Sequence, residues 1–438
     1  MIGLAFIIHT LLIITMLITV MWLEKDCKKI ILWNLIIVLT SVLGFIVYFI
    51  FFCDKPRIKN TIKLKFEQDE IYKKIMKVQL SNNTSNNEFI NFNKRNYSAD
   101  IFKQTSIDTI FNTEDFISKV TRDIDRAENY IIIQNQYFLS SINNENIIGL
   151  LKEKQRMGVE VKCVYGKACF KHRDVIKDLR LNGIRVCRFN RTDSFNKYYK
   201  NNKNIISVDG KQVYLYNHIN HKCEDKIECS NIYFKVGGDA VRAIDLDCHL
   251  DLSFATQKVY EIPKNIKYEL GNLETQYVTS VVDKDFEGLF LKAINDTHKT
   301  IIIHTDKFIP TPAIKQALQM AIMSGVEVKI MLAKNQASLQ YYSSRAYLKE
   351  MAMYGATAYL FDGQIASNFI VMDGLTFVGN FSLVNLEIRN NLQNILIVNN
   401  EKFTTDITSY YNNQINNSYR ICKPKNTLLR EKIFKKFN

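Results

Sequence analysis

The segments NIISVDG at residues 204–210 and NFIVMDG at residues 368–374 decide the fold, because they are one landmark that occurs twice. Each begins with asparagine, continues with a short apolar run and ends in Asp-Gly. Such a run before Asp-Gly is typical of a buried strand that ends in a tight turn. Two more landmarks precede each copy in the same order: YIII at 130–133 with TIII at 300–303, and GVEVK at 158–162 and 325–329. Three landmarks at nearly constant spacing indicate a duplicated unit.

Each copy also alternates between short β-branched runs and amphipathic stretches. A helical period follows the isoleucine run at residues 146–156 in the first copy and 311–323 in the second, and a glycine stands where each helix would end. Alternating strands and helices predict an α/β fold with helices on both faces of a sheet. We therefore expect two α/β halves related by a pseudo-twofold axis, residues 116–270 and 271–438, with a ligand site at their seam.

The chain before the repeat divides into two parts. Residues 54–115 are polar and contain an Asn/Ser-rich stretch, which predicts a linker or irregular segment. Residues 2–23 and 30–53 are apolar runs long enough to cross the ~30 Å hydrocarbon core, so residues 1–53 are predicted to form a two-helix transmembrane hairpin. A signal peptide or a buried helical hairpin fits less well, because no Lys or Arg precedes the first run and both runs are long.

The composition indicates an anionic partner. The chain has 438 residues, a formal charge of +14 and 47% hydrophobic residues, which excludes a disordered chain and favours binding to a membrane surface or nucleic acid. Basic residues are more numerous at 55–65 than at 24–29, which predicts a multi-pass protein of the cytoplasmic membrane with its large domain in the cytoplasm. The basic and aromatic run at 197–203 keeps a nucleic-acid surface open as an alternative.

This order of parts resembles the bacterial cardiolipin synthases of the phospholipase D superfamily. The resemblance covers nearly the whole chain and rests on VLGFIVY at 42–48, FKVGGDAVR at 234–242, LSFAT at 252–256 and LREKIF at 429–434. The segment at 42–48 is similar to that family's second span, and the segment at 429–434 to its terminal helix. The segments at 234–242 and 252–256 are both similar to the connector between its halves. The resemblance implies two tandem phospholipase D-like domains and a phosphatidyltransferase that converts two phosphatidylglycerols into cardiolipin and glycerol, with no cofactor.

The family's signature is the HKD motif, His-x-Lys-x4-Asp, which occurs once in each half. By resemblance, one His attacks the phosphodiester to give a phosphohistidine, the other protonates the leaving group, and both Lys hold phosphate oxygens. The chemistry requires these residue types. Neutral imidazole is a nucleophile near pH 7, and fixed positive charge stabilises the phosphoryl group in the transition state of its transfer.

Both copies of the motif have lost the His and the Lys. Counted back from the retained aspartates, the motif positions are held by Asn202, Asn204 and Asp209 in the first half and by Ala366, Asn368 and Asp373 in the second. Lys203 lies one position off, so its side chain is expected on the opposite side of the strand. Asn391 and Gln393 stand where the family commonly has Asn-x-Glu, and are cleft candidates. Loss of a nucleophile can cost about 10⁶ in rate, so no catalytic residue is expected to function.

We therefore expect a cardiolipin-synthase-like pseudoenzyme of phospholipid metabolism. It would bind anionic phospholipids, phosphatidylglycerol or cardiolipin, or act as a regulatory partner of an active homologue. Two alternatives stay open: an active cardiolipin synthase and, less favoured, a membrane-tethered nucleic-acid-binding module. His218, His221, Cys223 and Cys229 are the richest group of metal-ligand types, but their spacing matches no standard zinc site, and no metal is expected.

Overall fold

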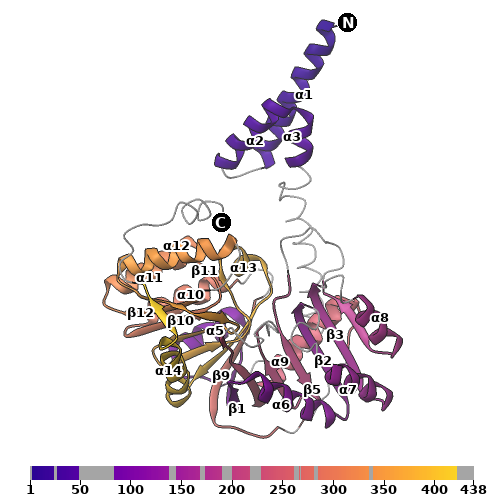
Figure 1. Cartoon of the computed structure of the whole chain (residues 1–438), viewed down its shortest axis with the longest axis vertical. Coiled ribbons are helices and arrows are strands. Elements are labelled where there is room, and N and C mark those ends of the chain that lie inside the picture. Colours follow the sequence, from indigo (N-terminus) through magenta and orange to yellow (C-terminus); the bar gives the residue numbers. More distant parts are fainter. Residues whose placement is uncertain are drawn as a thin grey trace. The chain divides into compact units, whose positions relative to one another are not determined.

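The computed structural model describes residues 2–23, 27–48, 83–137, 145–167, 173–189, 200–217, 228–260, 266, 268–280, 285–334 and 339–421. The chain divides into two compact units, Met1–Glu67 and Gln68–Asn438 (Figure 1). Three features of the sequence lie outside the described residues: the basic cluster at 55–65, the His/Cys segment at 218–223 and the expected terminal helix at 429–434.

The described residues of the first unit form three helices: α1 (Ile2–Leu23), α2 (Cys27–Thr40) and α3 (Val42–Val47). A small apolar cluster holds them together, in which the rings of Trp33 and Tyr48 lie 5.3 Å apart beside Val20 and Ile37. Ser41 separates α2 from α3 with a left-handed φ of 50°, a conformation that costs free energy for a residue with a side chain. The second apolar run is therefore two short helices instead of one long helix.

The predicted transmembrane hairpin over residues 1–53 is wrong, and so is the multi-pass membrane localisation built on it. Among the described residues, no helix combines the length and the apolar character needed to cross a membrane. The second run shows one physical reason. α2 has 14 residues, which is about 21 Å of helix against a hydrocarbon core of ~30 Å. Apolar composition alone did not reveal the backbone break at Ser41.

The second unit is mixed α/β. Its described helices are α5 (Glu88–Tyr97), α6 (Thr113–Asp125), α7 (Glu145–Arg156), α8 (Arg173–Leu181), α9 (Val241–Thr256), α10 (Phe286–Asp296), α11 (Pro312–Met323), α12 (Leu339–Tyr354), α13 (Asn385–Asn390) and α14 (Glu401–Ile415). Its strands in the first half of the sequence are β1 (Ile101–Ile110), β2 (Tyr130–Tyr137), β3 (Glu160–Lys167), β4 (Arg185–Arg188), β5 (Ile205–Val208), β6 (Gln212–Leu215), β7 (Glu228–Ser230) and β8 (Tyr233–Gly238). Those in the second half are β9 (Leu273–Thr279), β10 (Thr300–Thr305), β11 (Phe308–Ile309), β12 (Glu327–Ala333), β13 (Thr357–Phe361), β14 (Gly363–Ile365), β15 (Phe369–Met372), β16 (Leu375–Val378), β17 (Leu383–Val384), β18 (Asn394–Asn399) and β19 (Ser418–Arg420).

One sheet of 15 strands runs through both halves in the order β19-β13-β12-β10-β15-β16-β18-β9-β1-β8-β6-β5-β2-β3-β4. Read outward from the central β1–β9 pair, strands β8, β6, β5, β2, β3 and β4 match β18, β16, β15, β10, β12 and β13. Orientation matches too, because β2 is parallel to β3 and antiparallel to β5, as β10 is to β12 and β15. The mixed α/β fold with a repeated order of strands is confirmed.

Equivalent glycines follow helix α7 in the first half and helix α11 in the second. Gly158 follows α7 with φ 96°, and Gly325 follows α11 with φ 92°. The next N–H groups turn back onto the helices, from Val159 to the carbonyl of Lys154 and from Val326 to that of Ala321, each at 3.0 Å. This is the helix stop that the sequence predicted, and only glycine adopts such backbone angles without strain.

The segment at 54–115, expected as a linker, contains regular structure in its second part. Helix α5 begins at the N-cap residue Asn87, whose side chain accepts the N–H of Phe89 at 3.0 Å. Strand β1 pairs with β8 of the first half and with β9 of the second, so it lies at the centre of the sheet. Polar residues along β1 hid it from the sequence, because apolar alternation is weak there. Each half has a separate apolar core beside the sheet, with α6, α7 and α8 near β2 and β3, and α11 and α12 near β10 and β12 (Figure 1).

Candidate functional site

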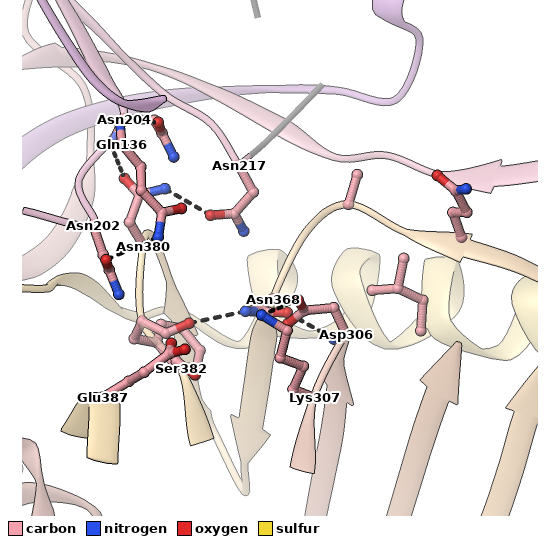
Figure 2. Close-up of a pocket in the computed structure, with 14 residues that line it drawn as sticks. Gln136, Asn202, Asn204, Asn217, Asp306, Lys307, Asn368, Asn380, Ser382 and Glu387 are labelled. Atoms are coloured by element: carbon pink, nitrogen blue, oxygen red, sulfur yellow. Dashed lines mark hydrogen bonds and ion pairs between the residues drawn. The ribbon is translucent and has the colours of Figure 1, made fainter. Parts of the chain in front are cut away.

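The degenerate motif positions of both halves converge on one cavity of about 160 Å³. Asn202 and Asn204 come from the segment before β5, and Ala366 and Asn368 from the equivalent segment before β15. The other lining residues are Gln136, Asn217, Asp306, Lys307, Gln364, Ile365, Asn380, Phe381, Ser382 and Glu387 (Figure 2). Amide side chains dominate this lining.

On the first-half side, two asparagines hold the end of strand β2. The side-chain oxygen of Asn204 accepts the backbone N–H of Gln136 at 2.9 Å. The side-chain NH2 of Gln136 donates to the side-chain oxygen of Asn202, also at 2.9 Å. Both asparagines are nearly buried. They therefore satisfy polar groups of the protein at positions where the family signature has His and Lys.

The second half repeats this arrangement. The side-chain oxygen of Asn368 accepts the backbone N–H of Asp306 at 3.0 Å, just after strand β10. Its NH2 group donates to the carbonyl of Phe381 at 2.9 Å. Ala366 contributes only a methyl group, so the second His position holds no polar side chain at all. An asparagine can serve the backbone at both Lys positions because it accepts and donates, whereas a lysine ammonium only donates.

Asn380 joins the two halves at the cavity. Its side-chain oxygen accepts the backbone N–H of Asn204 at 2.8 Å. Its NH2 group donates to the carbonyl of Tyr216 at 2.5 Å and to the side-chain oxygen of Asn217 at 2.6 Å. Gly379 allows this approach, since a Cβ there would lie 2.7 Å from the carbonyl oxygen of Asn394 and φ is 133°. No sequence pattern pointed to Asn380.

The charged groups of the cavity lining are two carboxylates and one ammonium. The ammonium of Lys307 lies 3.7 Å from the carboxylate of Asp306. Asp306 raises the pKa of Lys307, burial lowers it, and Glu387 adds a smaller upward effect. Lys307 therefore stays protonated, and its charge is offset by two negative groups. The cavity lacks the surplus positive charge that a phosphate site requires.

The retained motif aspartates lie outside this cavity lining and serve the backbone. Asp209 accepts the N–H groups of residues 128, 129 and 130 at 2.9, 2.7 and 2.9 Å. Asp373 accepts those of residues 298, 299 and 300 at 2.9, 3.1 and 2.8 Å. Each therefore fixes the loop that enters β2 or β10. Their φ angles, 54° and 49°, belong to the tight turn that precedes glycine.

Asn391 and Gln393 are buried beside the cavity but do not line it. The side-chain oxygen of Asn391 accepts the backbone N–H of Lys200 at 3.3 Å. The side chain of Gln393 accepts the N–H of Ser382 at 3.1 Å and donates to the carbonyl of Glu387 at 2.8 Å. Gln393 therefore positions two residues that do line the cavity.

Lys203 lies just before β5 and is not among the residues that line the cavity. Its ammonium is almost completely buried and lies 2.6 Å from a carboxylate oxygen of Asp247 and 3.0 Å from one of Asp251, both on α9. Burial lowers the pKa of Lys203, but the two carboxylates outweigh burial and raise it overall. Lys203, the last residue of the basic run at 197–203, is therefore not exposed for contact with a nucleic acid.

Helix α9 brings more buried polar groups into the interior of the unit. The hydroxyl of Tyr277, on β9 of the second half, donates to Asp247 at 2.6 Å. Gln134 and Asn201 donate to Asp251 at 2.7 and 2.9 Å. Burial raises the pKa of Asp251 to about 6; Lys203 opposes that shift and Asp247 adds to it. Three aspartates among the buried apolar residues of one helix were the sequence signal for this cluster.

Histidines and metal-ligand clusters are absent from the cavity lining given above. Elsewhere in the described part of the chain, no group of three His, Cys, Asp or Glu side chains could hold a metal ion. His304 is buried on β10, where Nδ1 donates to the carbonyl of Ser367 at 2.9 Å and Nε2 lies 3.1 Å from the hydroxyl of Ser230. Burial lowers the pKa of His304 to about 4. His304 is a satisfied core residue.

Solved structures of similar fold place the second unit in a class. The chain matches the phosphatidylserine synthase of Haemophilus influenzae Rd KW20 with a TM-score of 0.60 and 13% identity, covering 80% of this chain and 97% of that one. A polyphosphate kinase of Porphyromonas gingivalis matches with a TM-score of 0.51 and 10% identity, covering 76% and 52%. Both likenesses show the fold alone, a mixed α/β phospholipase D-like fold with a repeated order of strands.

Sequence comparisons name the family within that class. Residues 290–415 match the family described as cardiolipin synthase, PLD-like domain. The major cardiolipin synthase ClsA of Bacillus subtilis is 25% identical, over 89% of this chain and 86% of that protein. A cardiolipin synthase of Oceanobacillus iheyensis is 26% identical, over 92% and 93%. These matches support a divergent cardiolipin synthase family member.

Proposed function

We propose that this chain has lost phosphatidyl transfer and acts in phospholipid metabolism as a lipid-binding or regulatory homologue of active cardiolipin synthases. The observation that carries this proposal is the set of side chains at the four motif positions. Asn202, Asn204 and Asn368 are amides, and Ala366 is apolar. None of them forms a covalent phosphoryl intermediate or supplies positive charge.

No other group of the described cavity lining replaces the missing nucleophile. Ser382 is the one hydroxyl there, and its oxygen makes no hydrogen bond to a base among the described residues. A serine needs such a base within about 3 Å to attack phosphorus. Lys307 is protonated and lies beside Asp306, so it does not act as a base near pH 7. The side-chain oxygens of Asn202, Asn204 and Asn368 already accept hydrogen bonds from other groups of the protein.

The names of the relatives support a phospholipid as the ligand class. The matched proteins of Bacillus subtilis and Oceanobacillus iheyensis are cardiolipin synthases, and they match along most of this chain. A cavity retained at the junction of the halves suits a lipid head group better than a nucleic acid. Phosphatidylglycerol or cardiolipin is the proposed ligand, and an active synthase is the proposed partner for a regulatory role.

The test is cardiolipin synthesis in cells that lack their own cardiolipin synthases. The chain is expressed there, and cardiolipin is measured by mass spectrometry against an empty vector and against the Bacillus subtilis synthase as a positive control. We expect no cardiolipin above the vector. Cardiolipin above that level, from chain produced at a level matched by immunoblot, would overturn the proposal and support an active synthase.

A further inference from the structure

The cavity keeps both donors and acceptors for a ligand after its internal hydrogen bonds are made. The NH2 groups of Asn202 and Asn204 donate to no protein atom among the described residues, although both side-chain oxygens are used. The side-chain oxygen of Gln136 likewise accepts nothing within the described chain. Glu387, on α13, adds a carboxylate that forms no ion pair with a described residue. Figure 2 shows these groups facing one open space.

This mixture does not suit a phosphate. Non-bridging phosphate oxygens only accept hydrogen bonds and carry negative charge, so a phosphate site is built from donors and cations. Here the carboxylates of Asp306 and Glu387 would repel such an anion, and the ammonium of Lys307 is already beside Asp306. A buried acceptor that faces another acceptor is left unsatisfied, which weakens binding further.

The same mixture suits hydroxyl groups. A hydroxyl donates one hydrogen bond and accepts others, so a polyhydroxyl ligand can use amide NH2 groups, amide oxygens and carboxylates together. The volume of about 160 Å³ exceeds the ~30 Å³ share of one water molecule several times, so a ligand larger than a single ordered water fits. Ala366 and Ile365 leave part of the wall apolar, against which a carbon chain can pack.

We propose that this cavity binds an uncharged polyhydroxyl group of glycerol type and excludes the phosphodiester. The inference rests on the proposed function, because a working phosphatidyl transfer site must hold the phosphate instead. Such a group can belong to the head group of phosphatidylglycerol or to a free polyol. Both sources share the same hydroxyl chemistry.

Calorimetric titration of the full-length protein tests the specificity. The probes are dihexanoyl phosphatidylglycerol, dihexanoyl phosphatidylmethanol, free glycerol and inorganic phosphate. Phosphatidylmethanol has the same charge and phosphodiester as phosphatidylglycerol but lacks the diol. We expect phosphatidylglycerol to bind about tenfold more tightly than phosphatidylmethanol, since at least one buried hydrogen bond distinguishes them. Competition by glycerol but not phosphate is expected, and weak competition by glycerol assigns the lipid as the source.

Variants place the binding in the cavity. Asn202→Leu removes the NH2 donor, and Asn202→Asp keeps the shape and the acceptor for Gln136 while removing the donor. Both are expected to lower the affinity for phosphatidylglycerol about tenfold. Asn412→Leu, at an exposed position of α14, is the matched control and should leave affinity unchanged. Thermal unfolding of each variant establishes that it is folded.

The outcomes separate this inference from the proposed function. Equal binding of phosphatidylglycerol and phosphatidylmethanol, or competition by phosphate, overturns the polyol site even if no cardiolipin is made. Cardiolipin synthesis in the cellular test overturns the proposed function, whatever the titration shows. Unchanged affinity in both folded Asn202 variants also overturns the assignment to this cavity.

Discussion

The side-chain oxygen of Asn380 accepts the backbone N–H of Asn204 at 2.8 Å, and this bond joins the second half to the first at a predicted motif position. The NH2 group of Asn380 also reaches the carbonyl of Tyr216 and the side chain of Asn217. One buried amide therefore satisfies three groups of the opposite half. The cavity owes its shape to this junction as much as to its own lining.

Replacing Asn380 should weaken the whole second unit. Asn380→Ala leaves the N–H of Asn204 and the carbonyl of Tyr216 without this partner, and each buried group left unsatisfied costs roughly 1–3 kcal/mol. We expect the free energy of unfolding in urea to fall by about 3 kcal/mol. Asn412→Ala, at an exposed position, is the control and should change it by no more than about 0.5 kcal/mol. Equal effects of the two variants would contradict the joining role.

Restoring the signature residues should not restore an enzyme. In the quadruple variant Asn202→His, Asn204→Lys, Ala366→His and Asn368→Lys, the two lysines cannot accept the N–H groups of Gln136 and Asp306 that the asparagines now accept. We expect a loss of roughly 2–6 kcal/mol in unfolding free energy for two such groups, and no cardiolipin by mass spectrometry. Cardiolipin from this variant would show that the surroundings still support catalysis.

The retained aspartates should matter for stability and not for ligand binding. Asp209→Asn and Asp373→Asn keep the size of the side chain and tolerate a positive φ, but replace one carboxylate oxygen with a donor that faces backbone N–H groups. We expect each to lower the unfolding free energy by about 2 kcal/mol. Asp406→Asn, on the exposed face of α14, is the control. Loss of phosphatidylglycerol binding in a folded Asp209 or Asp373 variant would contradict a purely structural role.

Lys203 should be among the most sensitive positions of the chain. Lys203→Met leaves the carboxylates of Asp247 and Asp251 buried without their cation, and breaking a buried ion pair typically costs about 3–5 kcal/mol. Adding Asp251→Asn removes one of the uncompensated charges and should recover part of this loss. Lys402→Met, on exposed α14, tests the effect of removing a surface lysine. Denaturant unfolding of the single and double variants measures the coupling, and an unaltered midpoint for Lys203→Met would refute it.

His304 should make stability depend on acidity. Its folded pKa is lowered to about 4 by burial, although the hydrogen bond to Ser367 opposes that shift. The unfolded chain therefore takes up a proton between about pH 6.5 and 4 that the folded protein does not, and stability falls as the pH falls through this range. The loss should approach about 3 kcal/mol by pH 4.

The contribution of His304 is measured from the slope of the unfolding free energy against pH. His304→Gln should reduce this slope between pH 6.5 and 4, whereas His298→Gln, at an exposed position, should leave it unchanged. Asp251 acts in the opposite sense, because its folded pKa of about 6 lies above the unfolded value and makes its contribution more favourable as the pH falls. Both variants keep Asp251, so its contribution cancels. Parallel slopes for all three proteins would rule out the assigned role of His304.

The duplicated α/β architecture and the helix-ending glycines could be predicted from the sequence alone, and the sequence also predicts that four signature residues are missing. These features are local, because a strand, a helix stop or a motif position is set by residues close together in the chain. The absence of Lys203 from the cavity lining was also expected, although Lys203 lies before β5 and not within the strand. The apolar runs at residues 1–53 led to the wrong prediction of a transmembrane hairpin, because composition does not show the break between helices α2 and α3 at Ser41.

The residues that line the cavity could be identified only from the tertiary structure. Gln136 lies on β2, Asn380 in the loop between β16 and β17, and Glu387 on α13, and no spacing in the sequence connects them with Asn202 or Asn368. Strand β1 was hidden for a related reason: its central place in the sheet comes from pairing with one strand of each half, and both partners lie far away in the chain. The ligand chemistry of a cavity is the sum of the groups that packing brings to it, and packing joins residues that the sequence keeps apart.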